Sequence, residues 1–131
     1  PVLVAVTMDV PFVARGFAGE IDHLADLIAQ AHRHPGFALV DILQPCVSFN
    51  KVNTYAWYKE RCYKLDSSHD PTDRAAALAR AAEFGERIPI GVIHKGGRPA
   101  FEGFLNERVR RPLATSAPDR VKLAEIIEGY A

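Results

Sequence analysis

The clearest periodic pattern in the chain lies in residues 20–34, where apolar side chains recur among polar ones. These apolar positions are Ile21, Leu24, Leu27, Ile28 and Ala31. Recurrence after three and four residues predicts an α-helix with one buried face. Acidic residues in the first turn and basic residues in the last turn suit the helix dipole. Pro35 and Gly36 then predict the end of this helix.

Three short apolar runs predict β-strands. The first is Phe12–Arg15, which is followed by a turn at Gly16–Gly19. The second, Gly36–Leu43, is almost unbroken in its hydrophobicity, which is typical of a strand covered on both faces in a parallel sheet. The third is Ile88–His94, where Pro89 favours an edge position because proline cannot donate a hydrogen bond to a neighbouring strand.

Two helices are predicted between the second and third strands. A short helix spans residues 54–63, with Thr54 or Asn53 as its N-cap. An alanine-rich helix follows, with Asp70 as the expected cap and Pro71 as the first helical residue.

The ends of the chain carry weaker patterns. Residues 1–10 fit either the end of a helix or a short strand, and a short amphipathic helix is predicted to begin at Asp119. The order of strands and helices predicts an α/β fold, with a mostly parallel sheet and flanking helices. Because sheets usually hold about four to six strands, three strands suggest part of a larger fold.

Composition and charge narrow the functional classes. The chain has 131 residues, of which 48% are hydrophobic, so one domain with a real core is expected. Sixteen basic and sixteen acidic residues cancel, and no apolar run approaches the ~20 residues that span a bilayer. We therefore expect neither nucleic acid nor a membrane as a partner. Pro1 is an unusual first residue, so we expect the native chain to extend upstream.

The two cysteines, Cys46 and Cys62, are not in a CxxC pair and form no disulfide framework, which favours a reducing, cytoplasmic location. Cys62 is interpreted as a packing residue on a helix. Cys46 lies just after a predicted buried strand, and it fits either a small buried thiol or a functional cysteine.

Ligands in open α/β sheets collect at the carboxyl ends of the strands, and two turns lie there if the strands are parallel. Arg15 precedes the first turn, where it could face an anion, although an ordinary surface arginine is the alternative. Asn50 and Lys51 lie in the second turn, after Cys46. They could position a cofactor or a substrate carboxylate, or belong to a solvated loop.

Three segments resemble, in order, the β subunit of 2-oxoacid:ferredoxin oxidoreductases, most of all the 2-oxoglutarate type. They read FVARGFAGEIDHLADLI, GFALVDILQPCVSFNKVNTYAWYKER and HDPTDRAAALARAAEFGERIPIGVI. The resemblance covers about residues 1–95. It implies that residues 1–95 are the C-terminal part of a thiamine-diphosphate-binding domain, and that residues 96–131 are a C-terminal extension.

The β subunits of this family bind thiamine diphosphate with Mg²⁺ and hold a 4Fe-4S cluster. Three of the cluster cysteines belong to their N-terminal half, and the fourth lies in an LQPC segment that corresponds to Cys46. The resemblance therefore implies that Cys46 is a metal ligand, with Asn50, Lys51 and Arg15 as further cofactor-binding candidates. The Gly-Asp-Gly and CxxC motifs of the family do not occur here, so we expect neither cofactor to bind this chain alone.

The function implied by the resemblance is CoA-dependent oxidative decarboxylation of a 2-oxoacid, with electrons passed through the cluster to ferredoxin. An α subunit is the implied partner, and QPCVSFNKVN favours 2-oxoglutarate as the substrate. One alternative is a non-catalytic interaction half-domain that docks onto a partner subunit. Another is a small thiol enzyme with Cys46 as the nucleophile and a histidine as the base.

Overall fold

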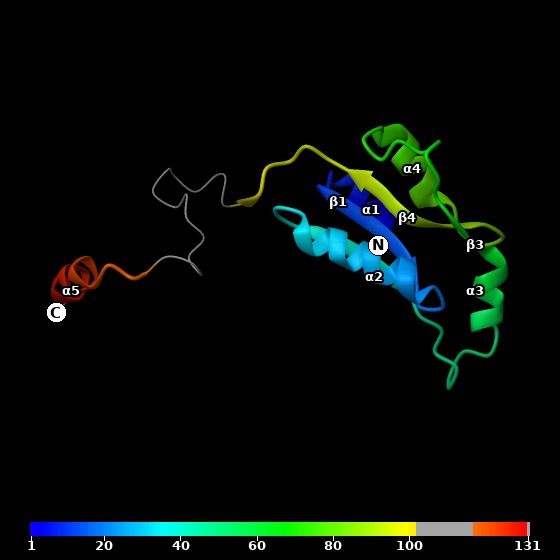
Figure 1. Ribbon diagram of the computed structural model, residues 1–131, viewed down its shortest axis with the longest axis horizontal. Coiled ribbons are helices and arrows are strands. Elements are labelled where there is room, and N and C mark those ends of the chain that lie inside the picture. The colour runs from blue at the N-terminus through cyan, green and yellow to red at the C-terminus, as the bar shows by residue number, and fades with distance from the viewer. Residues whose placement is uncertain (102–116, 131) are drawn as a thin grey trace. The chain divides into compact units, whose positions relative to one another are not determined.

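The computed structural model describes residues 1–101 and 117–130 (Figure 1). The chain divides into two compact units, Pro1–Ala100 and Phe101–Ala131. The first unit contains α1 (Val2–Thr7), β1 (Phe12–Phe17), α2 (Ile21–Arg33), β2 (Ala38–Leu43), α3 (Tyr55–Arg61), β3 (Cys62–Lys64), α4 (Arg74–Ala82) and β4 (Ile88–Lys95). The second unit contains α5 (Arg120–Glu128). The division predicted at residue 95, which depends on the family resemblance, stays a prediction.

One sheet organises the first unit, with the strand order β2-β1-β4-β3. β1 pairs with β2 in parallel, from Phe12 opposite Ala38 to Phe17 opposite Leu43. β3 pairs with β4 in parallel, whereas β1 and β4 are antiparallel. The predicted fold class, an α/β fold with a mostly parallel sheet and flanking helices, is confirmed.

Helices cover both faces of this sheet (Figure 1). Because successive strand residues point to opposite faces, Val13 contributes to one core, and Phe12 and Ala14 to another. The Val13 core also contains apolar residues of α1 and α4, including Val6 and Ala77. The Phe12 core contains Leu27 of α2. The sheet is therefore the middle layer between α2 and the α1–α4 pair.

Most of the predicted elements are present, with small shifts at their ends. α2 is confirmed, and Leu27 is buried on its inner face, although Ile21 and Ile28 remain exposed. Within residues 1–10, Val2–Thr7 form a helix, and no strand is present there. β1 continues through Phe17, so the glycine turn after it is shorter than expected. The predicted helix after Asp119 is confirmed as α5.

The start of α4 was predicted wrongly. Asp70 does not cap the helix, and Pro71 is not its first helical residue, because residues 70–72 form a separate turn. There, Asp70 Oδ1 accepts hydrogen bonds from the Thr72 backbone N at 2.8 Å and Oγ1 at 2.7 Å. The true N-cap is Asp73, whose Oδ1 accepts from the amides of Ala75 and Ala76 at 2.9 and 3.2 Å.

Two predictions about strand positions were also wrong. β4 lies between β1 and β3, so Pro89 is not in an edge strand. The pairing with β1 starts only at Gly91, so the missing amide of Pro89 interrupts no bond on that side. Conversely, β2 is an edge strand of this sheet and is not covered on both faces, since Ile42 is 43% exposed. β3, only three residues long, was missed and read as the end of α3.

Candidate functional site

The carboxyl ends of β1 and β2 meet at the same edge of the sheet, as the parallel pairing requires. The backbone N of Ala18, just after β1, donates to the backbone O of Leu43, the last residue of β2, at 3.0 Å. The turn after β1 and the loop after β2 are therefore joined where they leave the sheet, which confirms the expectation that the two lie at one end.

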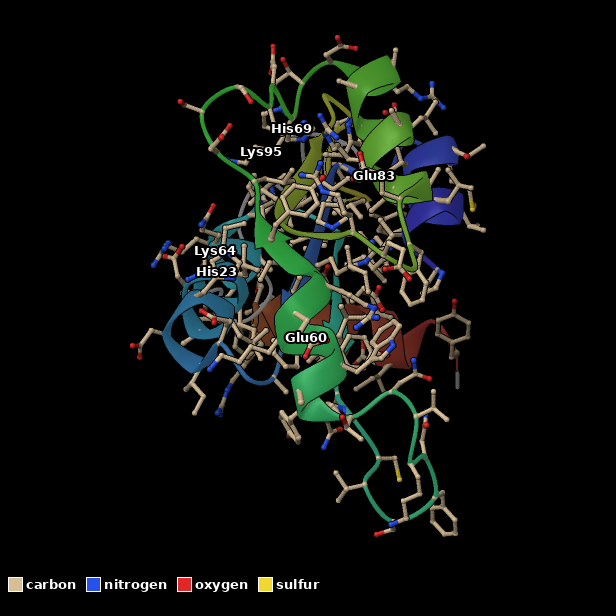
Figure 2. The ribbon with its side chains drawn as sticks, turned by 90° about the vertical axis from the view of Figure 1, so that its right-hand side faces the viewer. His23, Glu60, Lys64, His69, Glu83 and Lys95 are labelled. Carbon is tan, nitrogen blue, oxygen red and sulfur yellow. The ribbon has the colours of Figure 1, made fainter. Side chains whose placement is uncertain are left out.

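The loop of residues 44–54 carries Cys46 into solvent. The backbone O of Cys46 accepts hydrogen bonds from the amides of Phe49 and Asn50 at 3.3 and 2.8 Å, and these bonds close a turn directly after the cysteine. The Cys46 side chain itself is exposed and forms no disulfide. A small buried thiol is therefore the wrong interpretation of this position. Figure 2 shows the loop reaching beyond the N-terminal end of α3.

The side chains of Asn50 and Lys51 both form hydrogen bonds with the backbone of their own loop. Asn50 Oδ1 accepts from the backbone N of Val52 at 2.9 Å and of Asn53 at 3.0 Å. Lys51 Nζ donates to the backbone O of Val47 at 2.5 Å. These contacts show what orders the loop, and the predicted cofactor-binding role of both residues stays a prediction.

The far end of the loop is anchored by α3. Thr54 is the N-cap, as one of the two predicted alternatives, and its Oγ1 accepts from the backbone N of Trp57 at 3.4 Å. The Phe17 ring of β1 lies 5.9 and 5.7 Å from the rings of Tyr55 and Tyr58. This packing fixes α3 against the same sheet edge, so the loop is held at both ends.

The environment of Arg15 differs from both environments that the sequence suggested, which were a site facing a bound anion and an ordinary surface position. Its side chain lies inside the protein, and the residue is 4% exposed. Arg15 Nε donates to Asp41 Oδ2 at 3.1 Å, and Nη1 donates to the backbone O of Glu83 at 3.3 Å. The expected surface position is therefore wrong. The proposed part of Arg15 in cofactor binding stays a prediction that none of these contacts supports.

Cys62 is half-buried at the start of β3 and packs near Phe17, Leu43 and Ile90. Burial raises the pKa of its thiol to about 11, and the positive charge of Arg15 only partly opposes this effect. The thiolate is the reactive form of cysteine. Cys62 is thus poorly suited to nucleophilic or ligand chemistry, in agreement with its interpretation as a packing residue.

A second polar region, which the sequence did not indicate, lies between α2 and residues 65–71. A cavity of about 260 Å³ is lined there by His23, Asp26, Gln30, Asp66 and His69, among others. Burial and the nearby Lys64 ammonium lower the pKa of His23, and the two side chains lie near each other in Figure 2. No periodic pattern could have found this cluster, because its members come from separate elements.

The described residues offer no complete metal site. Within residues 1–101 and 117–130, no group of three or more His, Cys, Asp or Glu side chains is placed to hold a metal ion. In the same ranges, none of the helices has the length and the apolar character that a membrane crossing requires.

The chain matches known proteins in sequence. Residues 46–108 match the family described as the C-terminal part of the pyruvate ferredoxin oxidoreductase beta subunit. The chain is 39% identical to 2-oxoacid:ferredoxin oxidoreductase 2, subunit beta, of Aeropyrum pernix, over 96% of this chain and 44% of that protein. It is 40% identical to the 2-oxoacid:ferredoxin oxidoreductase subunit beta of a Sulfolobus species, over 78% of this chain and 37% of that protein.

A solved structure resembles the fold as well. It is 2-oxoglutarate:ferredoxin oxidoreductase from Magnetococcus marinus, with 2-oxoglutarate, coenzyme A and succinyl-CoA bound. The TM-score is 0.75 at 30% identity, over 96% of this chain and 43% of that one.

In sequence and fold, the chain resembles a segment of an oxidoreductase subunit. More particularly, it is similar to the C-terminal part of the β subunits of 2-oxoacid:ferredoxin oxidoreductases. It spans less than half the length of the relatives described above, at 44%, 37% and 43%.

Proposed function

We propose that this chain forms the C-terminal part of a β subunit in which Cys46 is one thiolate ligand of a 4Fe-4S cluster. The observation that carries the proposal is the exposed Cys46 side chain on a closed turn at the carboxyl end of β2. Iron–sulfur clusters are held by cysteine thiolates. The family match also begins at this residue.

The residues of this chain can supply one cysteine ligand of such a cluster. Four cysteines usually hold a cluster of this type, and the other cysteine of this chain, Cys62, is half-buried with a raised pKa. The remaining ligands would therefore come from another part of the subunit. A reducing cytoplasm suits this arrangement, because Cys46 must persist as a free thiol until the cluster is inserted.

We further propose that residues 1–95 belong to a thiamine-diphosphate-binding domain, with Mg²⁺, and that residues 96–131 are an extension of it. The joined carboxyl ends of β1 and β2 support this, because ligands in open α/β sheets bind at that edge. When bound, thiamine diphosphate supplies the carbanion chemistry of decarboxylation. This chain would contribute part of the sheet edge and the Cys46 turn.

The proposed overall reaction converts a 2-oxoacid and CoA to an acyl-CoA, carbon dioxide, one proton and two electrons. Two ferredoxin molecules would each accept one of these electrons. 2-Oxoglutarate is the proposed substrate, supported by the QPCVSFNKVN segment and by the bound ligands of the Magnetococcus marinus enzyme. An α subunit would complete the enzyme, in keeping with the name "subunit beta" of the relatives.

The test is a Cys46→Ala substitution in the complete enzyme complex, with Cys62→Ala as the matched control. We expect the first variant to lose the electron paramagnetic resonance signal of this cluster, about four iron atoms per β subunit, and ferredoxin reduction. Cys62→Ala should keep all three. A Cys46→Ala complex with full iron content and normal ferredoxin reduction would reject the cluster proposal.

A second candidate function is a non-catalytic half-domain that docks onto a partner. The observation in its favour is the exposed apolar surface of the 44–54 loop, where Phe49 is 91% and Val52 is 72% exposed. Such a module predicts that Cys46→Ala leaves electron transfer unchanged, whereas Phe49→Ser weakens assembly of the complex. The same complex, assayed with both variants, therefore separates the two functions.

A further inference from the structure

We infer that Asn50 is a positioning residue for Cys46: it fixes the turn that directs the Cys46 thiol, by tying that turn to the start of α3. The importance of this geometry for a metal cluster rests on the proposed function. The hydrogen-bonded turn itself is a feature of the structure.

Asn50 makes four hydrogen bonds within the loop. Its backbone N donates to the Cys46 backbone O at 2.8 Å. Its side-chain Oδ1 accepts from the amides of Val52 and Asn53 at 2.9 and 3.0 Å. Its Nδ2 donates to Asn53 Oδ1 at 3.1 Å. Thr54, the N-cap of α3, follows directly, so one residue connects Cys46 to the helix.

Apolar packing does not hold the part of the loop that follows Cys46 in place. Val47, Phe49 and Val52 are mostly exposed, with residue exposures of 54%, 91% and 72%. A side chain in solvent gains little free energy from the hydrophobic effect. The loop contains no helix or strand that would order it. Its shape therefore depends on the polar contacts, and Asn50 makes more of them than Lys51, whose side chain forms one bond to the Val47 backbone O.

Side-chain oxygens of asparagine and aspartate commonly accept from a backbone amide two residues on, which builds a turn. Alanine at position 50 would remove both Oδ1 bonds and the Nδ2 bond to Asn53 while keeping the backbone bond to Cys46. Because the freed amides can reach water in an exposed loop, the fold should survive this substitution. What is lost is the fixed conformation between Cys46 and α3.

A cluster ligand must hold its sulfur in one direction, because a thiolate on a loosely ordered loop leaves the cluster more accessible to solvent and chelators. Asn50→Ala should therefore loosen the cluster without removing a ligand. Asn50→Asp loses the Nδ2 bond to Asn53 but keeps an acceptor oxygen for both amides, and it also adds a negative charge near the cluster. We expect this variant to retain the loop geometry and to lower the reduction potential.

The first arm of the test uses the full chain without any cofactor. Hydrogen–deuterium exchange is measured at the amides of Val52 and Asn53 in the wild type, Asn50→Ala, Asn50→Asp and Ser48→Ala. Ser48 is the matched control, since it is an exposed polar residue of the same loop. We expect exchange about five- to tenfold faster in Asn50→Ala, corresponding to one hydrogen bond of about 1 kcal/mol, and near wild type in the other two. Unchanged exchange in Asn50→Ala would overturn the inference.

The second arm uses the complete complex and follows iron release to a chelator and the paramagnetic resonance spectrum of the reduced cluster. We expect Asn50→Ala to release iron several-fold faster, with an altered spectrum, whereas Ser48→Ala matches the wild type. Wild-type release and spectrum in Asn50→Ala would reject the positioning role at the cluster. If instead Cys46→Ala keeps its cluster, the proposed function fails, while the exchange arm still decides whether Asn50 orders the turn.

Discussion

Arg15 of β1 and Asp41 of β2 are direct partners across the parallel pair, and their side chains join in an ion pair of 3.1 Å between Nε and Oδ2. The guanidinium is almost fully buried, with 5% of the side chain exposed, whereas 21% of the Asp41 side chain reaches solvent. The backbone O of Glu83, after α4, accepts a further bond from Arg15. One arginine thus links two strands and the segment that leads into β4.

Removing the carboxylate should cost more than removing the arginine. In Asp41→Ala a buried guanidinium loses its counter-charge, and we expect a loss of about 3 kcal/mol in the free energy of unfolding. Arg15→Met should cost less, because the Asp41 side chain can still reach water and methionine refills the space. Urea denaturation measures both variants. Glu60→Gln, in the exposed pair with Arg61, is the control and should change little. Equal losses in the two buried-pair variants would contradict this view.

Among Gly85, Gly91 and Gly97, substitution of Gly91 should destabilise the fold most. It has a φ of +141°, and a Cβ there would lie 3.2 Å from the Leu65 Cβ. Gly85 shares the positive φ, at +106°, but has open space around it, and Gly97 has neither constraint. We expect Gly91→Ala to cost about 2–3 kcal/mol, Gly85→Ala about 1 kcal/mol, and Gly97→Ala almost nothing. Thermal or urea unfolding of the three variants checks this order.

Asp73, rather than Asp70, should control the start of α4. Asp73→Ala removes the acceptor for two backbone amides, and we expect a loss of about 1 kcal/mol in stability. Asp73→Asn should remain close to the wild type, because asparagine caps helices equally well. Circular dichroism together with urea denaturation measures both effects. A neutral Asp73→Ala would mean that the helix does not need this cap.

The two cysteines should differ strongly in reactivity. Iodoacetamide at pH 8 should alkylate the exposed Cys46 much faster than Cys62, because burial raises the pKa of the Cys62 thiol to about 11. Peptide mapping by mass spectrometry distinguishes the two sites. Comparable rates at pH 8 would contradict the burial of Cys62. Unusually fast alkylation of Cys46 at lower pH would instead favour the thiol-enzyme alternative.

The same shift in pKa predicts a change in stability with pH. An ordinary cysteine has a pKa of 9.0, so the unfolded chain loses the Cys62 proton before the folded chain does. The contribution of Cys62 is therefore fully present below about pH 9 and is lost as the pH rises towards 11. Cys62→Ser should show a weaker decline in stability than the wild type over this range. Parallel declines in the two proteins would contradict the assignment.

Much of the local structure could be predicted from the sequence. The apolar repeat of residues 20–34 predicted α2, and the run Gly36–Leu43 predicted β2. Thr54 was one of two predicted caps of α3, and a helix was predicted to begin at Asp119. These features are local, since they depend on side chains a few residues apart. The position of Cys46 shortly after a strand also followed from the sequence, as did the presence of polar residues after it.

Only the tertiary structure decided which distant segments meet. β4 inserts between β1 and β3 although Pro89 favoured an edge, and Arg15 finds Asp41, 26 residues away, inside the protein rather than at its surface. Periodicity reports which side chains are buried, but it does not identify their neighbours, because strand pairing is a long-range choice made by packing the whole sheet. The sequence indicated Asn50 as a candidate residue. Only the folded loop showed that the hydrogen bonds of Asn50 fix the turn that carries Cys46.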